Sequence, residues 1–208
     1  MHAAWYESWY DSLYDSWRTI RGVARSLRIY YGNRERRTAL DRLYGQFVAP
    51  GDLAFDIGAH VGDRVAALRR HDAFRKAAGG APGWEGQAWT RTIDVPVITL
   101  AMLVARHGAA VFIKIDVEGF ESEALAGLTR PSRVLSFEFT TIQRGMAEAC
   151  VERCAELGYT RYNAVLGESH ILVHRDWVRA DEITGWLHSL PQSANSGDIY
   201  ARLAGGGA

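Results

Sequence analysis

Short apolar runs alternate with helical patterns along the middle of the chain. Residues 53–57 (LAFDI), 111–117 (VFIKIDV) and 133–139 (RVLSFEF) are short and almost continuously apolar, as expected for strands buried on both faces. Between them, residues 101–108 and 121–128 carry apolar side chains at helical spacing. This alternation predicts an α/β fold, with a mostly parallel sheet covered by helices on both faces.

The pattern changes near the C-terminus. Residues 146–158 predict a helix that ends at a glycine, and no crossover helix follows directly. Instead, YTRYNAV at 159–165 and HILVH at 170–174 resemble two neighbouring strands. We therefore expect an antiparallel C-terminal pair to close the sheet.

The beginning of the chain predicts helices rather than strands. Trp5, Trp9, Leu13 and Trp17 recur at every fourth position with three tyrosines beside them, which gives a helix one broad aromatic face, and an arginine-rich stretch follows. Such a helix could dock on the α/β domain or on a second subunit. We divide the chain into an N-terminal helical segment at 1–45 and an α/β domain at 46–208.

Composition narrows the classes of partner. The 208 residues are 48% hydrophobic and 23% charged, with a formal net charge of zero. This balance gives no global electrostatic reason for binding nucleic acid, and no run approaches the ~20 apolar residues of a membrane span. The two cysteines, Cys150 and Cys154, lack nearby metal ligands and suit a reducing, cytoplasmic location.

Acidic residues mark the ends of the predicted parallel strands. Asp56 ends the first strand, Asp116 and Glu118 follow the second, and Glu138 lies within the third. Ligands of open α/β sheets bind beyond the carboxyl ends of the strands. Because buried carboxylates need hydrogen-bond partners, these acids predict one shared polar site.

A glycine loop follows the first strand. Gly58 and Gly62 bracket the sequence AHV, and glycine allows a tight turn or close approach of a ligand to the main chain. The following helix would direct free N–H groups to the same place. The spacing is not that of a dinucleotide site, which disfavours a nicotinamide-dependent dehydrogenase, and an ordinary strand-to-helix turn has the same pattern.

Two motifs together resemble a known family. FDIGAHVGD and FIKIDVEGFESEALAGL are similar to the FkbM family of S-adenosylmethionine-dependent methyltransferases, and the spacing of VPVITL and LSFEF agrees. The resemblance extends roughly from Arg36 to Phe139. It implies a Rossmann-like methyltransferase sheet and methyl transfer, typically to a hydroxyl of a small molecule or sugar.

The resemblance also implies a cofactor site. The loop around the methionine part of S-adenosyl-L-methionine would be formed by Asp56, Gly58, His60 and Gly62. Asp116 would face the same cofactor at the end of the next strand.

The catalytic side of the site is less defined. Asp116 and Glu118 would face the transferred methyl group, whereas Glu138 and His170 would lie on the substrate side. A hydroxyl nucleophile needs a base, and these four residues and His60 are all candidates. His170 could equally be a loop histidine without a catalytic role. No ligand spacing supports a metal site.

The sequence departs from the family after Arg70. Relatives continue into a second strand whose terminal acid holds the ribose, but residues 71–92 show no strand pattern. The pattern therefore lacks two strand–helix units of the family, which predicts a sheet truncated on one side. LAFDI would then be an exposed edge strand, which the N-terminal helix or a homo-oligomer could cover.

Two functions compete on these grounds. One is an O-directed S-adenosylmethionine-dependent methyltransferase, impaired by the missing ribose-binding region. The other is a non-catalytic remnant that acts as a binding or interaction module on the same scaffold.

Overall fold

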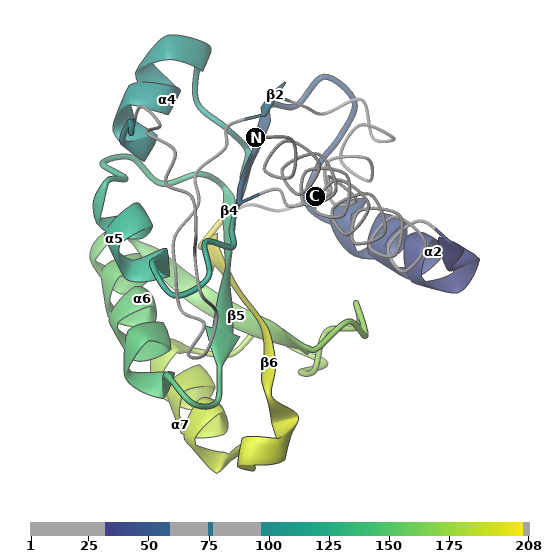
Figure 1. The fold of residues 1–208 in the computed structure, drawn as a ribbon. Helices are drawn as coiled ribbons and strands as arrows, with labels where there is room; N and C mark the ends of the chain where they lie inside the picture. Colours follow the sequence, from purple (N-terminus) through teal and green to yellow (C-terminus); the bar gives the residue numbers. More distant parts are fainter. Residues whose placement is uncertain (1–31, 59–74, 77–96, 206–208) are drawn as a thin grey trace, which may run out of the picture.

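The computed structural model describes residues 32–58, 75–76 and 97–205, which form one mixed sheet with helices on both faces (Figure 1). Within these residues the strands follow the spatial order β2-β1-β3-β4-β6-β5. Their bounds are β1 (Ala54–Ile57), β2 (Arg75–Lys76), β3 (Phe112–Ile115), β4 (Val134–Thr140), β5 (Tyr159–Leu166) and β6 (Ser196–Leu203). The helices are α2 (Arg34–Tyr44), α4 (Leu100–His107), α5 (Glu121–Ala126), α6 (Arg144–Glu156) and α7 (Ala180–Ser189), with a short 3₁₀ turn at Gln192–Ala194.

Strand directions bring several strand ends to one edge of the sheet. β2, β1, β3 and β4 are mutually parallel, whereas β6 runs antiparallel to both β4 and β5. β5 therefore runs in the same direction as β4. The carboxyl ends of β1, β3, β4 and β5 consequently share one edge, which is where open α/β sheets bind ligands.

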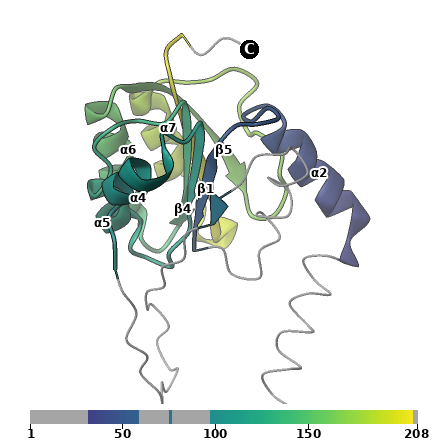
Figure 2. The same cartoon turned by 90° about the horizontal axis from the view of Figure 1, so that it is seen from above.

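The two faces of the sheet are covered differently (Figure 2). Helices α4, α5, α6 and α7 lie on one face, and α2 lies on the other. On the α2 face, Tyr44 and Phe47 pack on Phe112 of β3, and Phe47 also stacks on Tyr200 of β6. Aromatic packing thus fixes α2 against the middle of the sheet.

Local signals explain where the helices begin. The Asn33 side chain accepts a hydrogen bond from the N–H of Arg36 at the start of α2, and the Thr99 hydroxyl does the same for Met102 at the start of α4. Both are favoured N-cap residues. Gly108, with φ of 97°, then ends α4.

The predicted fold class is confirmed, but one strand assignment is wrong. The partner of β5 is β6, whereas HILVH contributes only a single bridge between Val165 and Leu172. The apolar pattern of β6 is interrupted by Gly197 and Asp198, so the sequence does not reveal it. An added Cβ at Gly197 would lie 2.2 Å from the carbonyl oxygen of Val165, which explains the glycine.

The truncated side of the sheet also differs in detail from the prediction. β1 is not the outermost strand, because the two-residue strand β2 pairs with Phe55 and Asp56. Neither residue of β2 is an acid, so the described residues provide no ribose-binding acid at its end. Among the described residues, the sheet therefore ends on this side with the two-residue strand β2.

Several predictions fall outside the described residues. The aromatic N-terminal segment, His60 and Gly62 are among them. The division at residues 45 and 46, the cytoplasmic location and the homo-oligomer stay predictions. Within the described ranges, none of the helices combines the length and apolar character needed to cross a membrane.

Candidate functional site

One face of the sheet changes from apolar to polar along the strands. Near the start of the strands, α2 packs over a row formed by Ala54, Phe112 and Val134. Side chains two positions further along a strand lie on the same face. The next row on this face is Asp56, Lys114 and Ser136, all buried. The parallel strands thus carry a polar patch towards their carboxyl ends.

Lys114 is the centre of this patch. Its side chain is 0% exposed, and its ammonium donates to Asp198 Oδ1 at 2.6 Å and to Asp116 Oδ2 at 3.4 Å. It also donates to the carbonyl oxygen of Ile115 at 3.3 Å. A charged lysine is tolerated in the interior only with such partners, so β6 supplies a counter-charge to β3.

Glu138 lies beside this ion pair and is unusually basic. Burial, as the largest cause, and the nearby Asp116 carboxylate together raise the pKa of its carboxyl to about 8, although the ammonium of Lys114 opposes the shift. Asp198 and Glu118 also raise it. Glu138 can therefore exchange a proton near neutral pH, unlike an ordinary glutamate.

The turn after β3 is held by a carboxylate from the next helix. Glu118 and Gly119 have φ of 55° and 103°, so the main chain turns sharply here. Buried Glu121 accepts hydrogen bonds from the N–H of Val117 at 2.9 Å and of Gly119 at 3.1 Å. Glu121 therefore fixes the position of the residues that follow the strand.

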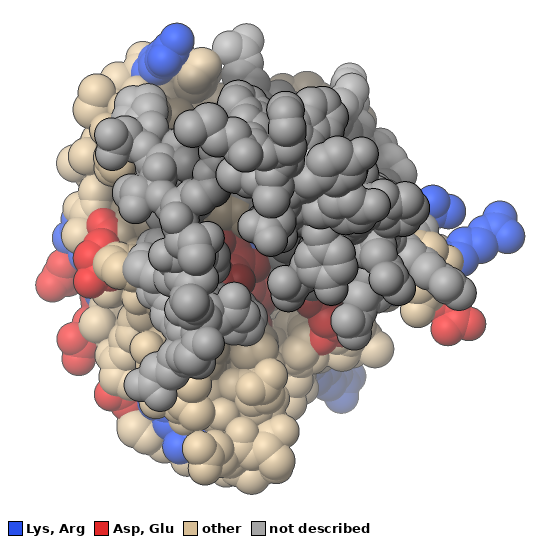
Figure 3. Space-filling view, in the orientation of Figure 1, with Lys and Arg blue, Asp and Glu red and all other residues tan. Residues whose placement is uncertain are grey.

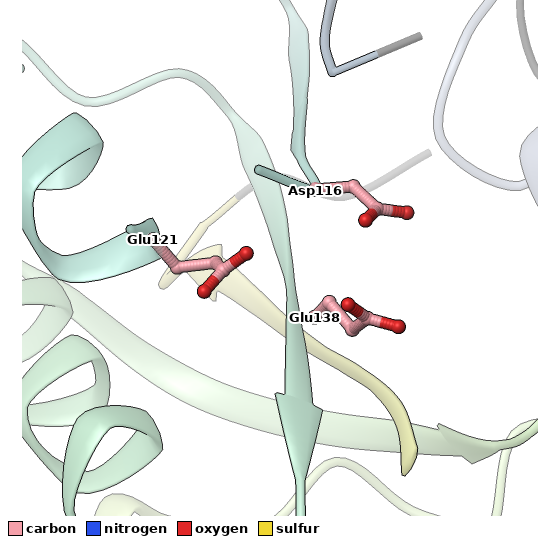
Figure 4. A group of neighbouring side chains, drawn as sticks. All are labelled: Asp116, Glu121 and Glu138. Atoms are coloured by element: carbon pink, nitrogen blue, oxygen red, sulfur yellow. The ribbon is translucent and has the colours of Figure 1, made fainter. Parts of the chain in front are cut away.

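Three carboxylates approach one another at this point (Figure 4). One oxygen each from Asp116, Glu121 and Glu138 lies within 4.8 Å of the others, with Asp116 and Glu138 projecting to one side and Glu121 arriving from α5. Glu121 is already engaged by main-chain N–H groups, and Asp116 faces Lys114. Donors of the protein itself therefore already contact two of the three carboxylates.

Gly58 is required by the protein's own main chain. Its φ is 85°, and an added Cβ would lie 1.5 Å from the carbonyl oxygen of Asp116. Glycine at this position is expected to allow another group to approach the main chain closely. In the structure that group is the main chain of Asp116, at the end of β3. This contact places the end of β1, with Asp56, directly beside the end of β3.

His170 lies at the same edge of the sheet, in the turn that follows β5. It is buried, has φ of 53°, and places Nε2 3.4 Å from Glu168 Oε2. Glu168 also pairs with Arg36 of α2. These contacts tie the turn to α2, whereas Asp116 and Glu138 interact with Lys114, and Glu118 interacts electrostatically with Glu138.

Three residues of this site were not predicted from the sequence: Lys114, Asp198 and Glu121. A lysine between two isoleucines in a strand expected to be buried is a usable signal, since it requires a hidden partner. Asp198 lies in a strand that the apolar pattern did not reveal, and no sequence signal identified it.

The family assignment follows from the sequence of this region. The model of the Methyltransferase FkbM domain matches residues 70–188, more than half of the chain. The chain belongs to this family. The match contains FIKIDVEGFE and the strand of Glu138, and it begins after FDIGAHVGD, so the first glycine loop lies outside the matched range.

Solved structures resemble this FkbM-family chain only distantly. A protein described as a hemolysin from Lactococcus lactis has 13% identity and a TM-score of 0.46, with 81% of this chain and 88% of that chain covered. A SAM-dependent methyltransferase from Geobacter sulfurreducens, in complex with S-adenosyl-L-homocysteine, has 12% identity and a TM-score of 0.38, with 81% and 90% covered. A comparison with curated proteins finds no match.

The charged residues at the strand ends fit the positively charged sulfonium of S-adenosylmethionine. Among the described residues, the strand ends present the carboxyl groups of Asp56, Asp116, Glu118 and Glu138 together with one buried cation, Lys114. Figure 3 shows acidic atoms near the centre of this view. An excess of carboxylates suits a positively charged sulfonium. In the described residues, β2 offers no corresponding acid for the ribose.

Proposed function

We propose that this chain is an S-adenosylmethionine-dependent methyltransferase that methylates a hydroxyl group of a small molecule or sugar, with Glu138 as the general base. The observation that carries the proposal is the position of Glu138, which has a pKa of about 8 and lies beside Asp116 at the strand ends of an FkbM-family domain. Family membership supports methyl transfer, and the basic carboxyl supports a hydroxyl acceptor.

In this proposal, each residue of the site has a role that follows from its contacts. When bound, S-adenosylmethionine supplies a methyl group on a positively charged sulfur. Glu138 takes the proton of the acceptor hydroxyl, and Asp116 and Glu118 provide negative charge beside it. Asp56 and Gly58 form the described part of the cofactor side, and His60 and Gly62 complete the proposed loop.

Glu138 is preferred over the other candidate bases for a physical reason. General bases work best when their pKa lies near the working pH, and the carboxyl of Glu138 meets this condition. Asp116 faces the ammonium of Lys114, and His170 contacts Glu168. Glu118 and His60 stay alternatives for the same role.

Calorimetry and product formation test the proposal together. We expect saturable binding of S-adenosylmethionine to the wild type and to Glu138→Gln, and loss of binding in Asp56→Asn. With a small-molecule extract as the source of acceptors, Glu138→Gln should form S-adenosyl-L-homocysteine at least ~100-fold more slowly. A folded wild type that gives no heat at millimolar cofactor would overturn the proposal.

The alternative is a non-catalytic binding module on the same scaffold. It is favoured by one observation, the two-residue strand β2 beside β1, which carries no acid for the ribose. The calorimetric experiment separates the two functions, because a remnant of this kind does not bind the cofactor.

A further inference from the structure

Two residues far apart in the sequence form the shortest charge contact described for the polar patch. Lys114 of β3 and Asp198 of β6 are separated by 84 residues, are both buried, and approach to 2.6 Å. Asp198 is also the direct cross-strand neighbour of Glu138 in the antiparallel ladder of β4 and β6. The pair therefore connects three strands at the level of the proposed base.

The cost of burial argues that this pair has a role besides stability. An apolar pair at these positions would often be as stable as a buried ion pair, because desolvation offsets most of the attraction. Lys114 makes a second contact with Asp116 Oδ2 at 3.4 Å. The ammonium of Lys114 thus contacts two carboxylates on either side of Glu138. These are Asp116, in the turn after β3, and Asp198, on β6.

We propose that Lys114 and Asp198 are positioning residues of the active site, which orient Asp116 and set the net charge around Glu138. This inference rests on the proposed function, because it explains how the base of that reaction is tuned. It makes the antiparallel strand β6 part of the functional site, although β6 carries no residue of the motifs that define the family resemblance.

The charged groups around Glu138 act with opposite signs. Asp116 and Glu118 from the turn after β3 and Asp198 from β6 raise the pKa of its carboxyl, whereas Lys114 from β3 lowers it. Glu121 of α5 also brings an oxygen into the same carboxylate group. Removing Lys114 or Asp198 should therefore move the pKa of Glu138 in opposite directions.

The experiment is a pH titration of the cofactor-free protein labelled with ¹³C at glutamate carboxyls. The resonance of Glu138 is identified by its loss in Glu138→Gln. We expect Lys114→Met to raise the pKa of Glu138 by about one unit or more, and Asp198→Asn to lower it by about half a unit or more. The double variant should lie between the two.

A purely structural pair would give a different result. If both folded variants leave the pKa of Glu138 within about 0.2 units of the wild type, or move it in the same direction, the proposal is overturned. Should Lys114→Met fail to fold, the Asp198→Asn variant decides alone, because asparagine keeps a hydrogen-bond acceptor for Lys114. Asp198→Glu should restore the wild-type value.

The result of the pH titration does not depend on the result of the calorimetric experiment with S-adenosylmethionine. The titration needs neither S-adenosylmethionine nor an acceptor, so a protein that fails the calorimetric experiment still reports on Lys114 and Asp198. If cofactor binds but the titration shows no opposite shifts, the positioning role fails and the proposed methyl transfer stands.

Discussion

At the scale of single residues, position 58 has no space for a side chain. An added Cβ would lie 1.5 Å from the carbonyl oxygen of Asp116, and φ is 85°. We expect Gly58→Ala to destabilise the protein by more than ~3 kcal/mol, because strain in the left-handed region adds to a clash with rigid main chain. Denaturation in urea, or loss of soluble protein on expression, measures this effect.

Gly51 is the matched control for this substitution. Its φ is 86°, but no atom lies within 4 Å of an added Cβ. Gly51→Ala should therefore show the conformational penalty alone, about 1–2 kcal/mol. Equal losses in the two variants would contradict the close approach between the ends of β1 and β3.

The residue scale also shows how much of the site the sequence could predict. Asp116 and Glu138 were predicted because each acid stands at or near the end of an apolar run, and the structure brings both together. Lys114 and Asp198 were not, because an ion pair between distant strands depends on which strands become neighbours. Sequence spacing carries no information on that contact.

At the scale of elements, α5 stabilises the turn that leads into it. Glu121 is its first residue and accepts hydrogen bonds from two main-chain N–H groups of that turn, those of Val117 and Gly119. We expect Glu121→Ala to lower the free energy of unfolding by about 2–3 kcal/mol, since both donors lose their acceptor. Chemical denaturation measures the difference.

Glu123 provides the comparison within the same helix. It is exposed and bonds only to the neighbouring Ser122 hydroxyl among the hydrogen bonds described for it. Glu123→Ala should change stability by less than about 0.5 kcal/mol. A similar loss in both variants would assign the effect to the acidic first turn of the helix rather than to the turn after β3.

Element prediction succeeded where patterning is strong. β1, β3 and β4 are almost continuously apolar runs that are largely buried, and this pattern identifies them as strands. β6 was missed, since Gly197 avoids a clash with β5 and Asp198 serves the ion pair. The glycine needed for close packing and the aspartate needed for the ion pair thus interrupt the apolar pattern by which β6 could be recognised.

At the scale of the whole molecule, Glu138 should make stability depend on pH. The pKa of its carboxyl rises from 4.5 to about 8 on folding. A raised pKa means that the native state binds the extra proton, so stability is unaffected below 4.5 and falls as pH rises towards 8. Above that pH the loss is complete, on the order of a few kcal/mol.

Glu138→Gln removes this loss while it removes the proposed base. We expect the variant to melt near the wild-type temperature at pH 4.5 and at a clearly higher temperature at pH 9. Comparing the two proteins at each pH cancels the titration of all other groups. A difference in melting temperature that does not change with pH would show that Glu138 ionises normally in the folded state.

The place of β6 has a consequence for how the protein is made. β6 lies between β4 and β5, two strands that precede it in the chain. Asp198 is translated 84 residues after Lys114, which takes about 4–17 s at roughly 5–20 residues per second. Until then β5 cannot join the rest of the sheet through β6, and a lysine destined for the interior lacks its closest counter-charge. We therefore expect the nascent chain to present unpaired strand edges, which favour aggregation, until β6 is available.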